Sequence, residues 1–91
     1  MVNRVVFTVR VYPEDTEVNL KDLQKRIEQK FPGEKILRSS EEPIAFGLVS
    51  LIIDITAPEE EGVSDRYETG IKEVEGVSEI QVESVRRLTK V

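Results

Sequence analysis

The sequence predicts an α+β fold, because strand-like and helix-like segments alternate along the chain in a definite order. Four segments are rich in β-branched residues, and two others repeat apolar residues at spacings of three and four. Their order is strand, helix, strand, strand, helix, strand, which right-handed crossovers fold into a ferredoxin-like βαββαβ sandwich. We therefore expect a four-stranded antiparallel sheet of spatial order 4-1-3-2, with two helices on one face, in a single domain over residues 1–91.

The first part of the chain predicts a strand followed by a helix. Residues 5–12 alternate with a period of two, which places Val5, Phe7, Val9 and Val11 on a buried face and Val6, Thr8, Arg10 and Tyr12 on the other. After a polar turn, Asn19 is expected to cap a helix whose apolar residues are Leu20, Leu23, Ile27 and Phe31. Pro32 and Gly33 end this helix.

The middle of the chain predicts a hairpin. The second strand runs from Lys35 to about Ser40, and the third, rich in β-branched residues, runs from Leu48 to Thr56. Between them, Pro43 and Gly47 stop regular structure, so the bend is expected there.

The last part of the chain predicts a second helix and a final strand. The acidic residues Glu59 to Glu61 precede a helix with Val63, Tyr67, Ile71 and Val74 on one face, and Gly76 ends it. Gly70 interrupts that face, and we expect it to let the helix approach the sheet closely. The final strand begins near Ser78, and Val85 is out of step with its alternation, which predicts a bulge or a change of face near Glu83-Ser84.

Composition excludes several classes of function. The chain has no Cys and no His, which rules out disulfides, thiolate or imidazole metal sites, and Ser-His-Asp or Cys-His catalysis. The formal net charge of −5 argues against direct nucleic-acid binding. No segment approaches the length of a membrane span, so we expect a cytoplasmic protein without a membrane partner. Charged residues make up 34% of the chain, a content that resembles thermophile surfaces.

Common sites of this fold are missing as well. The outward positions of the central strands carry one aromatic residue, Tyr12, which is not a stacking platform for RNA. The glycines are isolated, so no phosphate-binding loop is predicted. Carboxylates at Glu14-Asp15, Glu41-Glu42 and Glu59 to Glu61 are expected to be solvated surface charge, although two of them could in principle act as acid and base. No cofactor is implied.

Two features remain as candidate binding sites. Phe46 lies at the predicted bend, where it is either a contact for a partner or a cap folded back over the core. Arg86, Arg87 and Lys90 form a basic cluster near the C-terminus, which either addresses acidic groups on another molecule or is a solubilising tail. The strand directions of the predicted topology place the bend and the C-terminus at opposite ends of the sheet, on the order of 25 Å apart for strands of about eight residues.

Three segments together resemble translation elongation factor 1-beta, especially its archaeal members. They are the Pro-Ile-Ala-Phe-Gly sequence of residues 43–47, the opening pattern of residues 5–20 with its acidic turn, and Gly76-Val77 at the start of the last strand. The resemblance spans nearly the whole chain. It implies a ferredoxin-like nucleotide exchange factor that speeds GDP release from the GTPase elongation factor 1-alpha, which it would bind in its GDP-bound and nucleotide-free states.

The resemblance also implies roles for individual residues. Phe46 matches the bend phenylalanine that docks on the GTPase, with Pro43, Ile44 and Gly47 shaping the bend. Eukaryotic members of the family insert a lysine, next to last in the chain, near the magnesium of the nucleotide; Lys90, followed by Val91, resembles that ending. The preceding segment, residues 85–88, is archaeal in character.

Two other functions occur on this fold. A metabolite-sensing regulatory domain of the same fold, which binds its ligand at a dimer interface, is the alternative to an exchange factor. A small hydrolase of the acylphosphatase kind is disfavoured, because the residues after the first strand, Pro13-Glu14-Asp15, are acidic where a phosphate loop would be needed.

Overall fold

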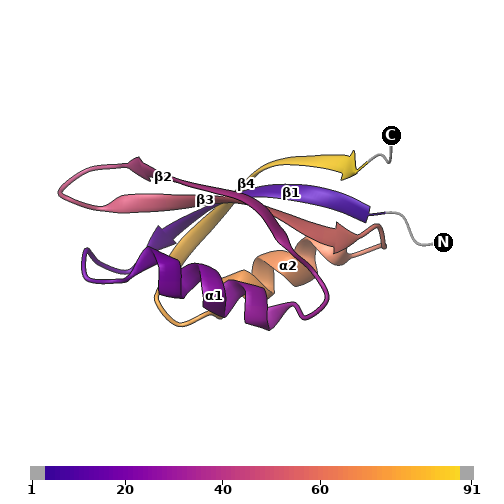
Figure 1. Cartoon of the computed structure of the whole chain (residues 1–91), viewed down its shortest axis with the longest axis horizontal. Helices are drawn as coiled ribbons and strands as arrows, with labels where there is room; N and C mark the ends of the chain where they lie inside the picture. Colours follow the sequence, from indigo (N-terminus) through magenta and orange to yellow (C-terminus); the bar gives the residue numbers. More distant parts are fainter. Residues whose placement is uncertain (1–3, 89–91) are drawn as a thin grey trace.

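The computed structural model of the chain describes residues 4–88 and contains the predicted order of elements (Figure 1). Its elements are β1 (Arg4–Pro13), α1 (Leu20–Lys30), β2 (Ile36–Pro43), β3 (Val49–Pro58), α2 (Val63–Lys72) and β4 (Val77–Leu88). All strand pairings are antiparallel and the spatial order is β2-β3-β1-β4, which is the predicted order 4-1-3-2 in reverse. The ferredoxin-like fold is therefore confirmed.

The core lies between the sheet and the two helices, which cover the same face (Figure 1). β1 contributes the apolar face that its alternation predicts. β3 contributes the alternate side chains that point towards the helices. The helices contribute the side chains that repeat at spacings of three and four. The largest fully buried side chains of this core are Phe7, Val9, Val11, Leu23, Ile27, Leu51, Ile53, Ile55 and Ile71.

Local signals set the ends of the helices. Asn19 caps α1 as predicted, because its Oδ1 accepts a hydrogen bond from the Asp22 N–H at 3.1 Å. α1 ends at Lys30, and Phe31 is the C-cap rather than a residue of the helix face. Gly70 was expected to let α2 approach the sheet closely, but the group that it contacts is the ring of Phe31. A Cβ at this position would lie 2.7 Å from Cζ of Phe31, so only a glycine leaves room for the ring.

The bulge predicted in the last strand is present. Thr8 of β1 pairs with Ser84, and the next residue, Val9, pairs with Val82, which leaves Glu83 as the extra residue of β4. Because the extra residue restores the alternation, Val85 lies on the same face of the sheet as Val82. Val85 is nevertheless 51% exposed.

The β2–β3 hairpin is longer than predicted and projects beyond the helices (Figure 1). β2 continues to Pro43, which pairs with Val49, three residues past the predicted end near Ser40. Proline is tolerated there because β2 is an edge strand whose outer N–H groups need no partner in the sheet. The hairpin therefore carries its bend well away from the core.

The face of the sheet opposite the helices is more buried than an open face usually is. Val6, Ser50 and Thr56 are buried there, and so is the Asp54 side chain. The long side chains of β2 and β4 reach this face, and Arg10 and Asp54 are the centres of two ion-pair groups across it.

The bend and the end of β4 lie at opposite ends of the long axis, as the topology predicts (Figure 1). The molecule measures 44 × 24 × 18 Å along its principal axes, so the two ends are well separated. Within residues 4–88, neither helix is long and apolar enough to span a membrane.

Candidate functional site

The bend between β2 and β3 is a tight turn over Ala45 to Leu48. The Leu48 N–H donates to the Ala45 carbonyl at 2.9 Å, and the Ile44 N–H donates to the Leu48 carbonyl at 2.8 Å. Both central residues have positive φ, 54° at Phe46 and 80° at Gly47, as a type I′ turn requires. Glycine adopts this conformation freely, whereas a phenylalanine does so at a cost of roughly 1–2 kcal/mol.

Phe46 is almost completely exposed at the tip of this turn. Its relative exposure is 97%, and Ile44 beside it is 47% exposed. The alternative in which Phe46 folds back as a cap over the core is therefore wrong for this structure. A strained and fully solvated aromatic residue contributes nothing to the stability of the isolated chain, which makes the bend a candidate contact surface.

At the opposite end of the sheet, the residues of the predicted basic cluster do not lie together. Arg86 and Arg87 are consecutive in β4, so their side chains lie on opposite faces of the sheet. Arg86 Nη2 lies 3.4 Å from Asp54 Oδ2 on the face away from the helices, and Arg87 Nη2 lies 2.7 Å from Glu59 Oε2 on the other. The third member, Lys90, lies outside the described residues, as does Val91.

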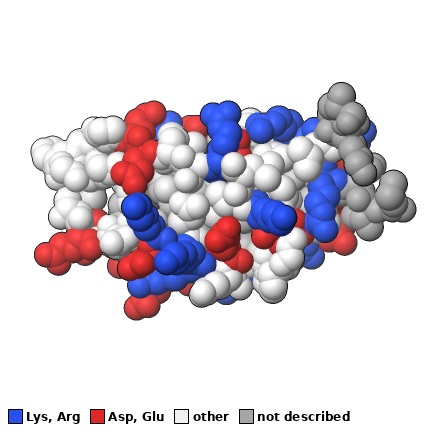
Figure 2. All heavy atoms as spheres, in the orientation of Figure 1, with Lys and Arg blue, Asp and Glu red and all other residues white. Residues whose placement is uncertain are grey.

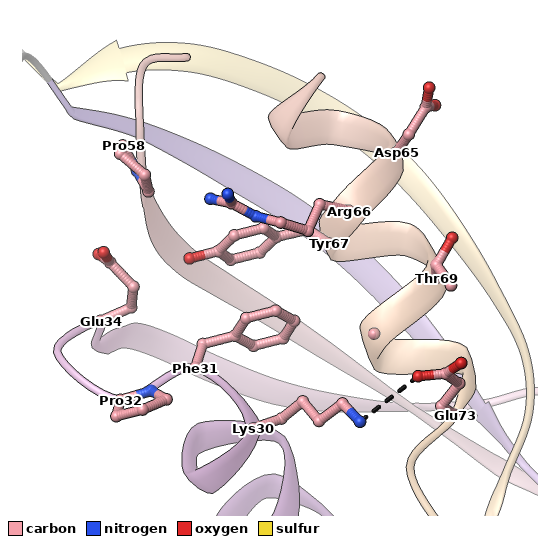
Figure 3. Close-up of a pocket in the computed structure, with 11 residues that line it drawn as sticks. Lys30, Phe31, Pro32, Glu34, Pro58, Asp65, Arg66, Tyr67, Thr69 and Glu73 are labelled. Atoms are coloured by element: carbon pink, nitrogen blue, oxygen red, sulfur yellow. Dashed lines mark hydrogen bonds and ion pairs between the residues drawn. The ribbon is translucent and has the colours of Figure 1, made fainter. Parts of the chain in front are cut away.

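The structure also contains a groove that the sequence did not predict, between the segment at the end of α1 and α2 (Figure 3). Its floor is formed by Phe31 and Tyr67, whose rings stack at 4.0 Å with an angle of 9° between their planes. Sequence reasoning placed both rings on helix faces as core residues. The sequence did signal a close approach at Gly70, on the same side of α2 as Tyr67, but the group that approaches is the ring of Phe31 and not the sheet.

Electrostatics differ between the groove and the sheet. Burial, and after it the charge of Glu34, raises the pKa of Tyr67 to about 12, so its hydroxyl stays protonated at any physiological pH. On the sheet, hydrogen bonds to Glu42 and then Glu83 raise the pKa of the Arg10 guanidinium, which therefore remains charged between two strands. No cluster of three or more metal-ligating side chains occurs within residues 4–88.

Charge is unevenly distributed along the molecule. Figure 2 shows uncharged and acidic side chains at its leftmost end, where the bend lies, and Lys and Arg further along towards the chain ends. Glu41 and Glu42 are exposed next to the bend, and Glu14, Asp15 and Glu17 lie in the turn before α1. Thr16 of that turn approaches the bend, since a Cβ on Gly47 would lie 3.5 Å from its Cγ2.

The chain matches one protein family and a group of archaeal proteins. The model of the EF-1 guanine nucleotide exchange domain matches residues 6–88. Elongation factor 1-beta of Aeropyrum pernix is 44% identical over 87 residues, which cover 93% of this chain and 97% of that protein. Elongation factor 1-beta of Desulfurococcus amylolyticus is 46% identical over 94% of this chain and 98% of its own, and that of Methanothermobacter thermautotrophicus is 42% identical over 92% and 96%. With its βαββαβ fold and a family match that covers nearly every described residue, the chain belongs to the EF-1 guanine nucleotide exchange domain family.

Proposed function

We propose that this chain promotes the release of GDP from elongation factor 1-alpha during translation elongation, in the cytoplasm. In this proposal the chain binds the GTPase in both its GDP-bound and nucleotide-free forms, and makes no direct contact with nucleic acid. Membership of the exchange-domain family supports the reaction, and the similarity to archaeal elongation factors 1-beta supports the elongation factor as its setting.

The observation that carries the proposal is the conformation of Phe46. Its ring is 97% exposed at the tip of a projecting hairpin, and its backbone has a positive φ. Docking into an apolar pocket on the GTPase would bury the ring and repay the backbone strain. Pro43, Ile44 and Gly47 hold the turn in shape, because Pro43 is the last paired residue of β2 and Gly47 has the second positive φ.

The two ends of the sheet suit a multidomain partner. With the bend on one domain, the end of β4 reaches a second domain across a molecule 44 Å long. We place the nucleotide-binding domain at the β4 end, where Arg86 and Arg87 lie and from which Lys90 and Val91 continue the chain.

The chemistry proposed for Lys90 is displacement of magnesium. Mg²⁺ requires near-ideal octahedral coordination and bridges phosphate oxygens, so an ammonium placed among its ligands competes for their charge and repels the ion. GDP then binds less tightly. Because coupling between two binding sites is reciprocal, nucleotide binding must in turn weaken the binding of the exchange factor, which allows turnover. No covalent bond changes in this process.

Release of fluorescent GDP from the cognate GTPase tests this function directly. The GTPase is loaded with the fluorescent nucleotide, excess unlabelled GDP is added, and the decay of the signal is followed with and without a substoichiometric amount of this chain. We expect acceleration with several turnovers for each molecule of the chain. No acceleration would contradict the proposed function.

A version that ends at Thr89 separates the two halves of the proposal. If this version binds the GTPase but does not accelerate release, Lys90 and Val91 carry the exchange step. If it accelerates release as the full chain does, the bend and the sheet are sufficient, and the role proposed for Lys90 is wrong.

A further inference from the structure

The groove beside α2 is not used by the function proposed above. It has a volume of about 700 Å³, within the range of about 300–1,000 Å³ that is usual for ligand pockets. Pro32 and Pro58 form apolar walls at one end, and Thr69 lies on the rim (Figure 3). The ion pair of Lys30 Nζ with Glu73 Oε1, at 3.4 Å, closes the other end.

The floor of the groove is rigid and apolar. The ring of Phe31 is held between its stacking partner, Tyr67, and the bare backbone of Gly70, where a Cβ would lie 2.7 Å from Cζ of the ring. Tyr67 is in turn packed on Phe7 of the core, with ring centroids 5.5 Å apart. The floor therefore presents a preformed aromatic surface, which lowers the entropic cost of binding.

The hydroxyl of Tyr67 is the unusual polar group of this site. The residue is only 3% exposed, yet its hydroxyl makes no hydrogen bond within residues 4–88. In Figure 3 it points into the groove, towards the gap between Glu34 and Pro58. No buried side-chain nitrogen or oxygen within residues 4–88 lacks a partner, so the unbonded hydroxyl is open to the groove and is available to donate to an acceptor that enters it.

The surroundings of the hydroxyl indicate which acceptor fits. Glu34 is already occupied, since one carboxylate oxygen accepts from the Thr56 hydroxyl and the other from Arg4. The guanidinium of Arg66 lies 6.0 Å from the centre of the Tyr67 ring, and its charge is shared with Glu60, whose Oε1 lies 3.2 Å from Nη2. The acceptor that fits this site is an uncharged, negatively polarised oxygen next to an apolar group. A backbone carbonyl beside an apolar side chain provides both.

The position of the groove identifies the molecule that supplies these groups. Pro58, one wall of the groove, is followed by Glu59, which is paired with Arg87 of β4. The groove is thus continuous with the end of β4, the end that we assign to the nucleotide-binding domain. We propose that the groove receives an apolar side chain of the GTPase, with a neighbouring backbone carbonyl accepting a hydrogen bond from the Tyr67 hydroxyl. This inference rests on the proposed function, and it adds a second anchor on the helix side of the molecule.

The test is Tyr67→Phe, which removes the hydroxyl and keeps the aromatic stack. KM for the GTPase and kcat for GDP release are measured at substoichiometric factor. We expect KM to rise about fivefold, the usual net effect of one hydrogen bond, with kcat within about twofold of the parent. The melting temperature should not fall, because the hydroxyl has no partner to lose in the free chain. Tyr12→Phe is the matched control, since its hydroxyl bonds Gln81 at 3.4 Å on the other face of the sheet.

A second variant fills the groove instead of removing a group. Thr69→Trp places a large side chain at the exposed rim, and we expect KM to rise about tenfold or more with an unchanged melting temperature. An unchanged KM in both variants, with a parent chain that does accelerate release, overturns the groove proposal alone. An equal rise in KM for Tyr12→Phe, or a lower melting temperature for Tyr67→Phe, overturns it as well. Failure of the parent chain to accelerate release overturns the proposed function instead.

Discussion

The two ends of the sheet present different kinds of surface. At the bend end, one apolar side chain projects into solvent from a strained turn, and exposed acidic residues stand beside it. At the other end, arginines of β4 are paired with Asp54 and Glu59, and an aromatic groove lies next to them. An exposed ring gains its free energy by being buried, whereas charges act through their position relative to other charges. In our proposal the bend therefore acts on affinity, the groove adds a second contact, and the charged end of β4 acts in the exchange step.

The largest effect should come from the β4 end. Lys90→Ala is expected to lower kcat for GDP release about 100-fold, the size typical of losing one preorganised charge in a reaction site, while KM changes little. The GDP-release assay at saturating GTPase measures it. Lys72→Ala, in the last turn of α2, is the control for a general loss of positive charge. Equal kcat for Lys90→Ala and the parent would show that the β4 end does not carry the exchange step.

Phe46→Ala is expected to act on affinity instead. Truncation of an exposed anchor should cost about 2 kcal/mol or more of binding free energy, which is a rise in KM of about 30-fold, with kcat preserved. Unfolding in urea should be unchanged, because the ring is 97% exposed in the free chain.

Leu37→Ala provides the matched control for Phe46→Ala, since Leu37 is an exposed apolar residue of β2 away from the bend. A small effect on KM there and a large one at Phe46 would locate the contact at the tip. If Phe46→Ala reduced the stability of the free chain and left KM unchanged, the residue would have a structural role and the bend would not be an anchor.

The sequence predicts the features of the bend better than those of the β4 end. The bend could be predicted because its signals are local: Pro43 and Gly47 bound a short segment, and Phe46 is out of the periodic pattern. The strand order followed from the element order, and the bulge at Glu83 followed from the position of Val85 in its strand. These features depend on neighbours in the chain.

The β4 end could not be predicted in the same way, because its contacts join distant segments. Arg86 and Arg87 are adjacent in sequence, but the strand alternation sends them to different faces, where Asp54 and Glu59 meet them. The groove depends on Phe31 leaving the helix face as a C-cap and lying over Gly70. Neither the pairing nor the stack has a signal within one segment, so both required the fold.

Alkaline unfolding should report on the groove and leave the bend unaffected. The folded-state pKa of Tyr67 is about 12, against about 10 in an unfolded chain, so the folded state holds its proton to higher pH. The stabilisation is complete below pH 10 and is lost as pH rises through 12; because solvent reaches the hydroxyl and screens the effect, it amounts to less than about 1.4 kcal/mol by pH 11. Urea unfolding between pH 9 and pH 11 measures it, and Tyr67→Phe should remove this component. A parent and a Tyr67→Phe chain with the same slope would contradict the assignment.

The smallest effect is expected from the ion pairs that hold the strands, and it should again differ between the ends. The Asp54 side chain is only 9% exposed, accepts from the Thr8 hydroxyl at 2.7 Å and pairs with Arg86. Asp54→Asn keeps an acceptor for Thr8 but removes the charge, at a cost of about 1 kcal/mol of unfolding free energy, because Arg86 is well solvated. Glu42→Gln at the bend end removes a carboxylate that is mostly exposed, and should cost less than about 0.5 kcal/mol. Urea unfolding at low salt and at about 0.5 M salt compares them, since screening reduces an exposed pair more than a buried one. If Asp54→Asn and Glu42→Gln cost the same unfolding free energy at both salt concentrations, burial does not distinguish the two ion pairs. In that case the hydrogen bonds to β1, and not Asp54, hold the end of β4.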